Sequence, residues 1–485
     1  MKRGYLTVYL SLTLTIIMSF IFSMVEGARI SAMRLQIEAA ADMGIDSIFS
    51  EYHRELLSQY DLFFIDTSYG EDYGSVYKTA DHLREYMSCH LRPSTGEIFQ
   101  FLYKDFHDIK VNDIEVDEAA FATDDKGRVL KRQAVEYMKE YYGLSYINMI
   151  RDQMKTVTDK KLDKGDIESD ISKAINKIEK KIQKKKKENK KNGIKEKVDD
   201  KKFREYTEIY NKLHYRGNLF LTVPNFNAIS KKTVRLEDYV SRRELSSGCG
   251  LTEELTLPDN IADEILFGEY LLDKCGYYTK QKDNSLLKYQ MEYIFSGKSC
   301  DLDNLRNTTF MLLQIRAASN LYYLEKDKFM QAQVKAIAVA IALLLRIPKE
   351  EIVNMIAFFL TLLWAYAEAV VDVRTLLDGG KIPLMKNAKS MNLSIVTLPL
   401  AFIVTHKAHN ESGLTYDGYL RILIGMMNPD KKVMRFMDIV EMDIRQTDGN
   451  SQFRLDRCID YIQVKIALLS DYGPEFLIQK RYRYF

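Results

Sequence analysis

Hydrophobic and polar positions predict one long helix with two parts at the N-terminus. Residues 5–25 form an uninterrupted apolar run without charge, proline or glycine. At about 1.5 Å per residue, a helix of this length crosses the apolar core of a bilayer. The run therefore predicts a transmembrane helix over 5–25, preceded by a short basic leader over 1–4.

Residues 26–64 predict an amphipathic stem that continues this helix. Apolar residues recur at spacings of three and four, which places them on one face: Ile30, Met33, Ile37, Ala41, Ile45, Ile48, Tyr52 and Leu56. Ala39, Ala40 and Ala41 would let a second helix approach closely, so we expect them at a helix–helix contact. The partner of this face is either the chain's own globular domain or a neighbouring subunit.

Residues 161–213 predict a lysine-rich arm of two antiparallel helices, with Asn192 and Gly193 near its tip. Residues 175–197 contain eleven lysines and three glutamates. One interpretation is a solvated, charge-rich arm. The other is contact with an anionic wall polymer or lipid through Lys184, Lys185, Lys186, Lys187, Lys190 and Lys191.

The remaining residues predict an α-rich α+β ectodomain, with an α+β part over 65–160 and a mainly helical core over 214–485. Rough alternation predicts strands at 109–116 and 218–223. Helical spacing predicts a helix that starts near Asp301 and another across 433–444.

Two further apolar segments, 336–345 and 355–371, predict a buried helical hairpin. A transmembrane hairpin is the alternative, but the second segment contains Glu368, and carboxylates within a membrane are energetically costly. Glu368 and Asp372 share one helix face at a spacing of four. We therefore expect a cation beside them, in a structural ion network under the turn at 378–380.

Composition narrows the possible functions. The 485 residues are 46% hydrophobic and 28% charged, which excludes a wholly disordered chain. Lys and Arg number 70 against 68 Asp and Glu, so the net charge of +2 disfavours a nucleic-acid partner. Five cysteines exclude a disulfide scaffold. Five separate thiols are the default, and a pair between Cys275 and Cys300 is the alternative.

No sequence motif predicts catalysis. His406 and His409 have a metal-like spacing but lack the glutamate of a zinc protease motif, and no phosphate-binding glycine loop or nucleophile elbow occurs. We therefore expect no catalytic, cofactor or metal site, and a protein that is not an enzyme. Lys2 and Arg3 before the apolar run favour a single-pass topology in the cell membrane, with a cytoplasmic N-terminus and the bulk of the chain extracytoplasmic.

The N-terminus also resembles a known family. Arg3 and Gly4, followed by Tyr-Leu-Thr-Val-Tyr over 5–9, resemble the TadE/TadG-like minor pseudopilins of tight-adherence (Flp) pili. The resemblance implies prepilin processing between Gly4 and Tyr5. Tyr9 departs from it, because many members have glutamate there, and the alternative is that Lys2 to Gly4 only flank a membrane span. Residues 289–306 and 364–386 resemble blocks of an uncharacterised bacterial family of single-anchor proteins associated with such systems.

Together these features predict a membrane-anchored structural or assembly protein. The resemblance implies a minor component or accessory of a tight-adherence pilus or secretion apparatus, which contacts other envelope proteins through its N-terminal helix. The alternative is an anchored cell-envelope binding protein whose lysine-rich arm contacts an anionic polymer or lipid.

Overall fold

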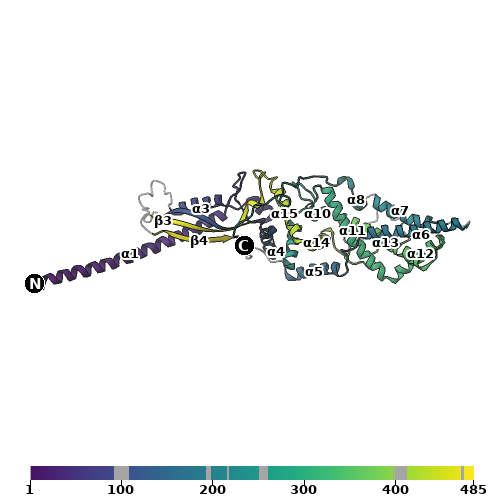
Figure 1. The fold of residues 1–485 in the computed structure, drawn as a ribbon, viewed down its shortest axis with the longest axis horizontal. Helices are drawn as coiled ribbons and strands as arrows, with labels where there is room; N and C mark the ends of the chain where they lie inside the picture. The colour runs from purple at the N-terminus through teal and green to yellow at the C-terminus, as the bar shows by residue number, and fades with distance from the viewer. Residues whose placement is uncertain are drawn as a thin grey trace. The chain divides into compact units, whose positions relative to one another are not determined.

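The computed structural model is helix-rich with one small sheet (Figure 1). It describes residues 2–91, 109–192, 198–215, 218–250, 260–396, 398, 412–470 and 474–484. The chain forms two compact units. Unit 1 comprises Met1–Glu136, Arg243–Pro258 and Ile444–Phe485, and unit 2 comprises Tyr137–Arg242 and Asp259–Asp443. The predicted ranges 65–160 and 214–485 do not follow this division, because the C-terminal strands pair with a strand from the first third of the chain.

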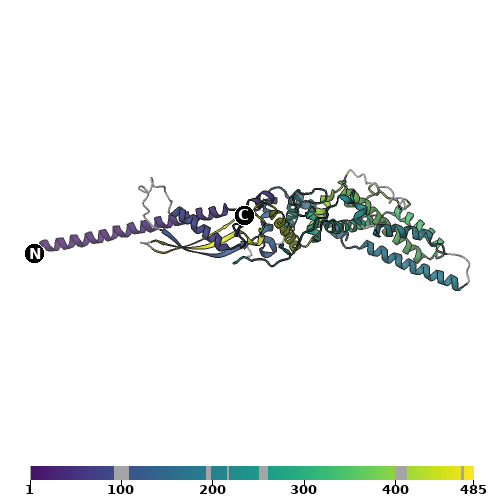
Figure 2. The same cartoon turned by 90° about the horizontal axis from the view of Figure 1, so that it is seen from above.

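Helix α1 (Lys2–Phe49) is a single helix that includes the apolar run and most of the predicted stem, as Figure 2 shows from above. The prediction that the stem helix reaches residue 64 is wrong. The chain leaves the helix after Phe49 and starts a separate helix, α2 (Arg54–Tyr60), whose first turn is capped by His53. Tyr52 and Leu56 therefore do not lie on the stem.

The sheet of unit 1 is antiparallel and centred on β3 (Cys458–Ser470). Strand β2 (Ile109–Phe121) pairs with one side of β3, with Ile114 opposite Ile466. Strand β4 (Phe476–Arg483) and the short β1 (Ile65–Asp66) also pair with β3. The predicted strand at 109–116 is confirmed as part of β2, whereas β3 and β4 lie in a range that was expected to be mainly helical.

The core of unit 1 forms between the sheet and two helices. The second half of α1 and helix α3 (Val76–Leu91) bury their apolar faces together with β2 and β3. Met33, Ile37 and Ile45 of α1 are buried in this core. The predicted apolar face of the stem is thus covered by the chain's own domain. Helix α4 (Asp124–Lys139) completes the helices of the unit.

Unit 2 is helical. Its helices are α5 (Leu144–Asp159), α6 (Ile167–Lys191), α7 (Lys201–Tyr215), α8 (Asn218–Thr222), α9 (Ile261–Lys274), α10 (Gln290–Ser296), α11 (Asp301–Lys326), α12 (Lys328–Leu344), α13 (Glu350–Leu377), α14 (Tyr416–Met426) and α15 (Pro429–Ile444). The predicted helices near Asp301 and across 433–444 are confirmed as α11 and α15. The predicted strand at 218–223 is wrong. Leu219 and Val223 instead share the buried side of a helical turn, which packs against α11 and α13.

Helix α13 is the central helix of unit 2 and packs against α6, α11 and α12. Although it is long and apolar enough to cross a membrane, 83% of its most apolar window is buried inside the protein. The prediction of a buried helical hairpin is therefore confirmed for α13. Its partner α12 is buried only on the side that faces α13, and Phe329 and Leu343 on the other side are exposed.

The predicted lysine arm is not a free appendage in the described residues. Helix α6 packs along α13, and its isoleucines at 171, 175, 178 and 182 are buried. Asn192 caps the end of α6, and Gly193 lies outside the described residues. All five cysteines lie in the described part of the chain, and each is a thiol, so the alternative pair of Cys275 with Cys300 is not formed.

Candidate functional site

The first half of α1 has no contact with the rest of the described chain. The most apolar window of α1 is 0% buried, and every large hydrophobic side chain from Tyr5 to Val25 is exposed. Exposure of such an apolar surface to water is unfavourable, and a helix that is apolar all round is normally buried in protein or membrane. This half of α1 can therefore serve as a membrane anchor. Gly4 and Tyr5 lie in its first turns, and the Tyr5 side chain is exposed.

Three hydroxyl side chains in the anchor region of α1 bond to their own helix. Ser11 donates to the carbonyl of Val8 at 2.9 Å, and Thr15 donates to that of Ser11 at 2.8 Å. Thr13 donates to the carbonyl oxygens of two residues in the preceding turn. These groups can enter a bilayer with their donors satisfied, so they do not by themselves require a second helix.

The second half of α1 carries a second apolar stripe that is exposed. Five apolar residues at spacings of three or four lie away from the core: Ala28, Ala32, Leu35, Ala39 and Met43. We call this set the outer stripe of α1. Of the three alanines predicted at a helix–helix contact, Ala40 and Ala41 are buried within the chain, and only Ala39 belongs to the outer stripe. A helix from another protein can thus reach Ala39, whereas Ala40 and Ala41 already pack within unit 1.

The lysines predicted to contact a polyanion lie on the solvent side of α6. Lys184, Lys187, Lys190 and Lys191 are exposed, and Lys185 is half-exposed. Lys186 is exposed as well, but its ammonium pairs with Asp200 at 2.8 Å. Their isoleucine neighbours are buried against α13, which fixes the lysine face outward. We call these residues the lysine face of α6.

A cleft of about 260 Å³ in unit 1 brings together several titratable groups, as the active sites of enzymes commonly do. It is lined by Glu51, His53 and Asp66, together with residues of the loop 449–453. The His53 ring accepts a hydrogen bond from the N–H of Leu56 through Nδ1 and bonds the Asn450 Oδ1 through Nε2 at 3.1 Å. Both ring nitrogens are therefore used to hold α2 and the loop, and neither is available as a general base.

Glu51 of this cleft also bonds neighbouring side chains. Its carboxylate accepts a hydrogen bond from the Tyr86 hydroxyl at 2.7 Å and contacts the His82 Nδ1 at 3.1 Å. The bond to Glu51 raises the pKa of Tyr86 above its ordinary value. Within the residues that the structure describes, no three His, Cys, Asp or Glu side chains gather in a way that could hold a metal ion. His406 and His409 lie outside those residues.

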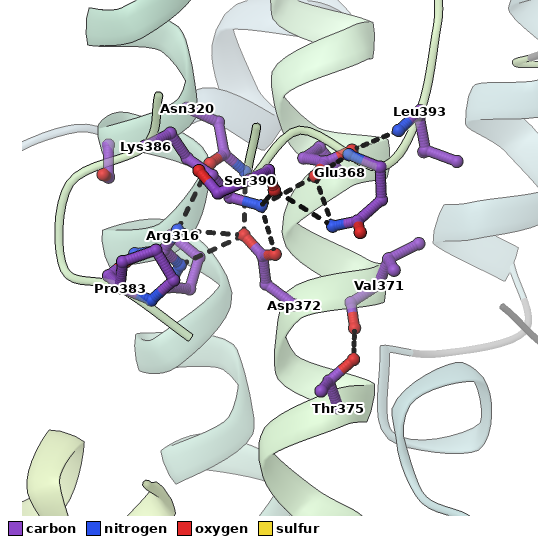
Figure 3. A network of polar contacts seen from close by, with 12 residues as sticks. Arg316, Asn320, Glu368, Val371, Asp372, Thr375, Pro383, Lys386, Ser390 and Leu393 are labelled. Atoms are coloured by element: carbon purple, nitrogen blue, oxygen red, sulfur yellow. Dashed lines mark hydrogen bonds and ion pairs between the residues drawn. The ribbon is translucent and has the colours of Figure 1, made fainter. Parts of the chain in front are cut away.

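Unit 2 contains the predicted ion network with a cation beside Glu368 and Asp372, as Figure 3 shows, but in the described part of the chain the network bonds the loop 383–393 and not the turn at 378–380 where it was expected. Lys386 is the expected cation: its ammonium contacts Glu368 and Asp372, each at 2.7 Å. A second cation, Arg316 of α11, contacts the other oxygen of Asp372 at 3.0 Å. Four residues make up these three ion pairs, and all four are buried: Glu368, Asp372, Lys386 and Arg316. Their side chains are 0% exposed.

Further hydrogen bonds join this network to the backbone of the loop that follows α13. The Glu368 carboxylate accepts from the N–H groups of Asn392 and Leu393, and Lys386 also donates to the carbonyl of Ser390. Arg316 donates to the carbonyl oxygens of residues 383 and 384. The four charges thus hold a loop on α13 and α11, and the arrangement is structural.

The carboxyl group of Glu292 in unit 2 has a pKa in the neutral range. Glu292 of α10 is completely buried, and burial raises its pKa to about 7. The Tyr416 hydroxyl donates to its Oε1 at 2.7 Å, and the N–H of Tyr278 donates to the same oxygen at 2.8 Å. Oε2 has no hydrogen-bond partner in the described part of the chain, so a proton there removes a buried charge.

Substituting Glu292→Gln should make the stability of unit 2 less dependent on pH. Because the folded-state pKa lies above the ordinary value, Glu292 stabilises the fold below about pH 4.5 and loses that contribution as the pH rises through about 7. The loss amounts to about 3 kcal/mol. We expect the variant and the parent to differ little at pH 5, and the variant to be more stable at pH 8.

Urea unfolding followed by the fluorescence of Trp364, the only tryptophan in the chain, measures this difference. The matched control is Glu325→Gln, because Glu325 is exposed on the neighbouring helix. A stability difference between Glu292→Gln and the parent that is the same at pH 5 and pH 8 would show that Glu292 does not titrate in this range.

Comparison with known proteins identifies a family but no activity. Residues 195–469 match the model of a family of unknown function, DUF5702. The match begins before α7 and ends within β3, so it includes the ion network. No curated protein and no solved structure matches the chain. Because the family match covers more than half of the 485 residues, the chain belongs to the DUF5702 family.

Proposed function

We propose that this chain is a membrane-anchored assembly protein that packs against other envelope proteins through α1. In this proposal residues 5–25 cross the cell membrane with the N-terminus in the cytoplasm, and both units are extracytoplasmic. The observation that carries the proposal is the outer stripe of α1, which continues the exposed apolar surface of the anchor beyond the bilayer.

The outer stripe suits packing against a second helix. Three of its five members are alanines, which let two helix backbones approach closely, and Leu35 and Met43 supply apolar area to bury. Leu35 is 71% exposed, so most of its apolar surface is still available to be buried against a partner. The opposite face of the same helix packs in the core of unit 1. A partner that binds the stripe is therefore attached directly to a folded domain.

The type of assembly rests on the resemblance of the N-terminus to TadE/TadG-like pseudopilins. It supports a minor component or accessory of a tight-adherence pilus or secretion apparatus, whose subunits associate through their N-terminal helices. Processing between Gly4 and Tyr5 belongs to this proposal. Mass spectrometry of the mature N-terminus tests it, and an intact Met1 would contradict processing.

Site-specific photocrosslinking in cell membranes tests the assembly proposal. A photoreactive phenylalanine analogue placed at Leu35 or Ala39 should give a discrete adduct with a second copy or with another single-span envelope protein. The matched control is the same analogue at Arg34, which is exposed on the same helix outside the stripe. Absence of any adduct from Leu35 and Ala39, or equal adducts from Arg34, would contradict packing through the stripe.

A second candidate function is supported by the lysine face of α6. Exposed ammonium groups held in a row by a buried isoleucine face are suited to an anionic wall polymer or lipid. Replacing Lys184, Lys187 and Lys190 by glutamine should weaken the binding of the full chain to polyphosphate at least tenfold at low salt. It should also flatten the salt dependence, because charge pairs are screened by salt.

The matched control for this measurement replaces three other exposed lysines of unit 2 by glutamine: Lys231, Lys298 and Lys431. This variant changes the net charge by the same amount without touching α6. If both triple variants bind polyphosphate equally, only the overall charge matters and the lysine face is not a binding surface.

A further inference from the structure

Unit 2 contains an apolar pocket that the proposed function does not use. It has a volume of about 430 Å³ and lies among the turn before α6, α10, α11 and α14. Met311, Met426 and Met427 line it, together with Phe310 and Ile315. We call it the methionine pocket. Its volume falls in the range of sites that bind small molecules, and methionine side chains adapt to ligands of different shapes.

One polar atom of a side chain that lines the pocket has no hydrogen-bond partner among the described residues. Gln314 of α11 is 9% exposed, and its Oε1 accepts a hydrogen bond from the N–H of Ile167 at 3.0 Å. Only the oxygen of the amide can accept that bond, so the orientation of the side chain is fixed. The amide nitrogen, Nε2, then has no hydrogen-bond partner in the part of the chain that the structure describes.

This unpaired donor defines the chemistry of a ligand. A buried donor without an acceptor destabilises the protein, so a ligand that brings an acceptor gains binding energy at that point. Apart from the amide, the wall is made mostly of methionine, phenylalanine, leucine and isoleucine side chains, which favours an apolar ligand body. Asp163 is the acidic residue of the lining and disfavours an anionic ligand.

We propose that the methionine pocket binds a small, neutral, apolar compound with one carbonyl oxygen, which accepts a hydrogen bond from the Gln314 amide. The apolar body of the compound lies against Met311, Met426 and Met427. The site is independent of α1, and its occupation requires neither membrane anchoring nor assembly.

Benzophenone is a suitable probe because it is neutral and apolar, carries one carbonyl oxygen and attaches covalently to nearby C–H groups when irradiated. Labelling of the full-length protein, followed by peptide mass spectrometry, should place the adduct on Met311, Met426 or Met427. Dicyclohexyl ketone should suppress this labelling at about fivefold lower concentration than dicyclohexylmethane, which has the same apolar body without the acceptor.

Two variants test the role of the amide. Gln314→Leu removes the donor, and Gln314→Glu removes it but keeps an acceptor for the N–H of Ile167. In both, labelling of the pocket methionines should fall about fivefold, and the two competitors should become equally effective. Gln333→Leu on α12, outside the pocket, is the matched control and should label like the parent.

Labelling that spreads over the chain without preference for the three methionines would overturn the proposal. Equal competition by the ketone and the hydrocarbon in the unaltered protein would overturn the hydrogen bond to Gln314. That comparison needs no variant, so it stands even if a substitution at Gln314 disturbs the start of α6.

Discussion

Substituting Lys386→Met should lower the free energy of unfolding of unit 2 by about 3–5 kcal/mol. Lys386 is the only ammonium that contacts both Glu368 and Asp372 among the described residues, and all three side chains are buried. Methionine has a similar length but no charge, so the substitution would leave Glu368 in an apolar interior with only neutral hydrogen-bond donors. Urea unfolding followed by Trp364 fluorescence reports the effect directly, because Trp364 lies one helical turn from Glu368 on α13.

The matched control is Lys389→Met, in the same loop, where the side chain is exposed. It should change the free energy of unfolding by less than about 0.5 kcal/mol. Adding Glu368→Gln to Lys386→Met should restore part of the lost stability, because it removes the uncompensated charge. If the Lys386 and Lys389 variants unfold at the same urea concentration, the buried network does not hold unit 2 together.

Replacing Ile16 and Ile17 together by arginine should release the chain from the membrane. Both side chains are exposed near the middle of the apolar half of α1, and each arginine at the centre of a membrane helix costs about 2.5–3.5 kcal/mol. Fractionation of cells followed by carbonate extraction measures the result. We expect the parent chain in the membrane pellet and the double variant in the supernatant or degraded.

The matched control replaces Leu35 and Met43 by arginine. These residues are exposed on the same helix but lie beyond the apolar run. This double variant should stay in the membrane pellet, while losing the adducts expected from the outer stripe. Retention of the Ile16 and Ile17 variant after carbonate extraction would mean that another part of the chain holds it on the membrane.

Local patterns were sufficient to predict several of the long helices but not the two units. The apolar run at 5–25, the stem as far as Phe49 and the helices α11, α13 and α15 all show their periodicity within one segment. The sheet joins β2 to β3, more than 300 residues later in the chain. No local pattern reveals such pairing, although burial alternates along β3 from Ile462 onward, as in a half-buried strand.

The same distinction holds for the candidate sites. The spacing of Glu368 and Asp372 was enough to predict a neighbouring cation, since two carboxylates on one helix face require compensation. Lys386 follows soon after α13, but Arg316 comes from another helix and was not predicted. The sequence could not predict the unpaired amide nitrogen of Gln314. Whether that nitrogen has a partner depends on which residues surround it in the fold, and no local pattern shows this.

Because α1 is one unbroken helix, the rotation of its apolar half about the helix axis is coupled to the sheet of unit 1. Each residue of an α-helix turns the chain by about 100°, so the side chains buried at Met33, Ile37 and Ile45 set the azimuth of every residue from 5 to 25. Residues 5–25 cannot rotate about the helix axis unless the sheet rotates with them. A partner that binds one side of residues 5–25 would therefore also fix the direction in which the sheet of unit 1 faces, and a rotation of this half of α1 about its axis would rotate unit 1 with it.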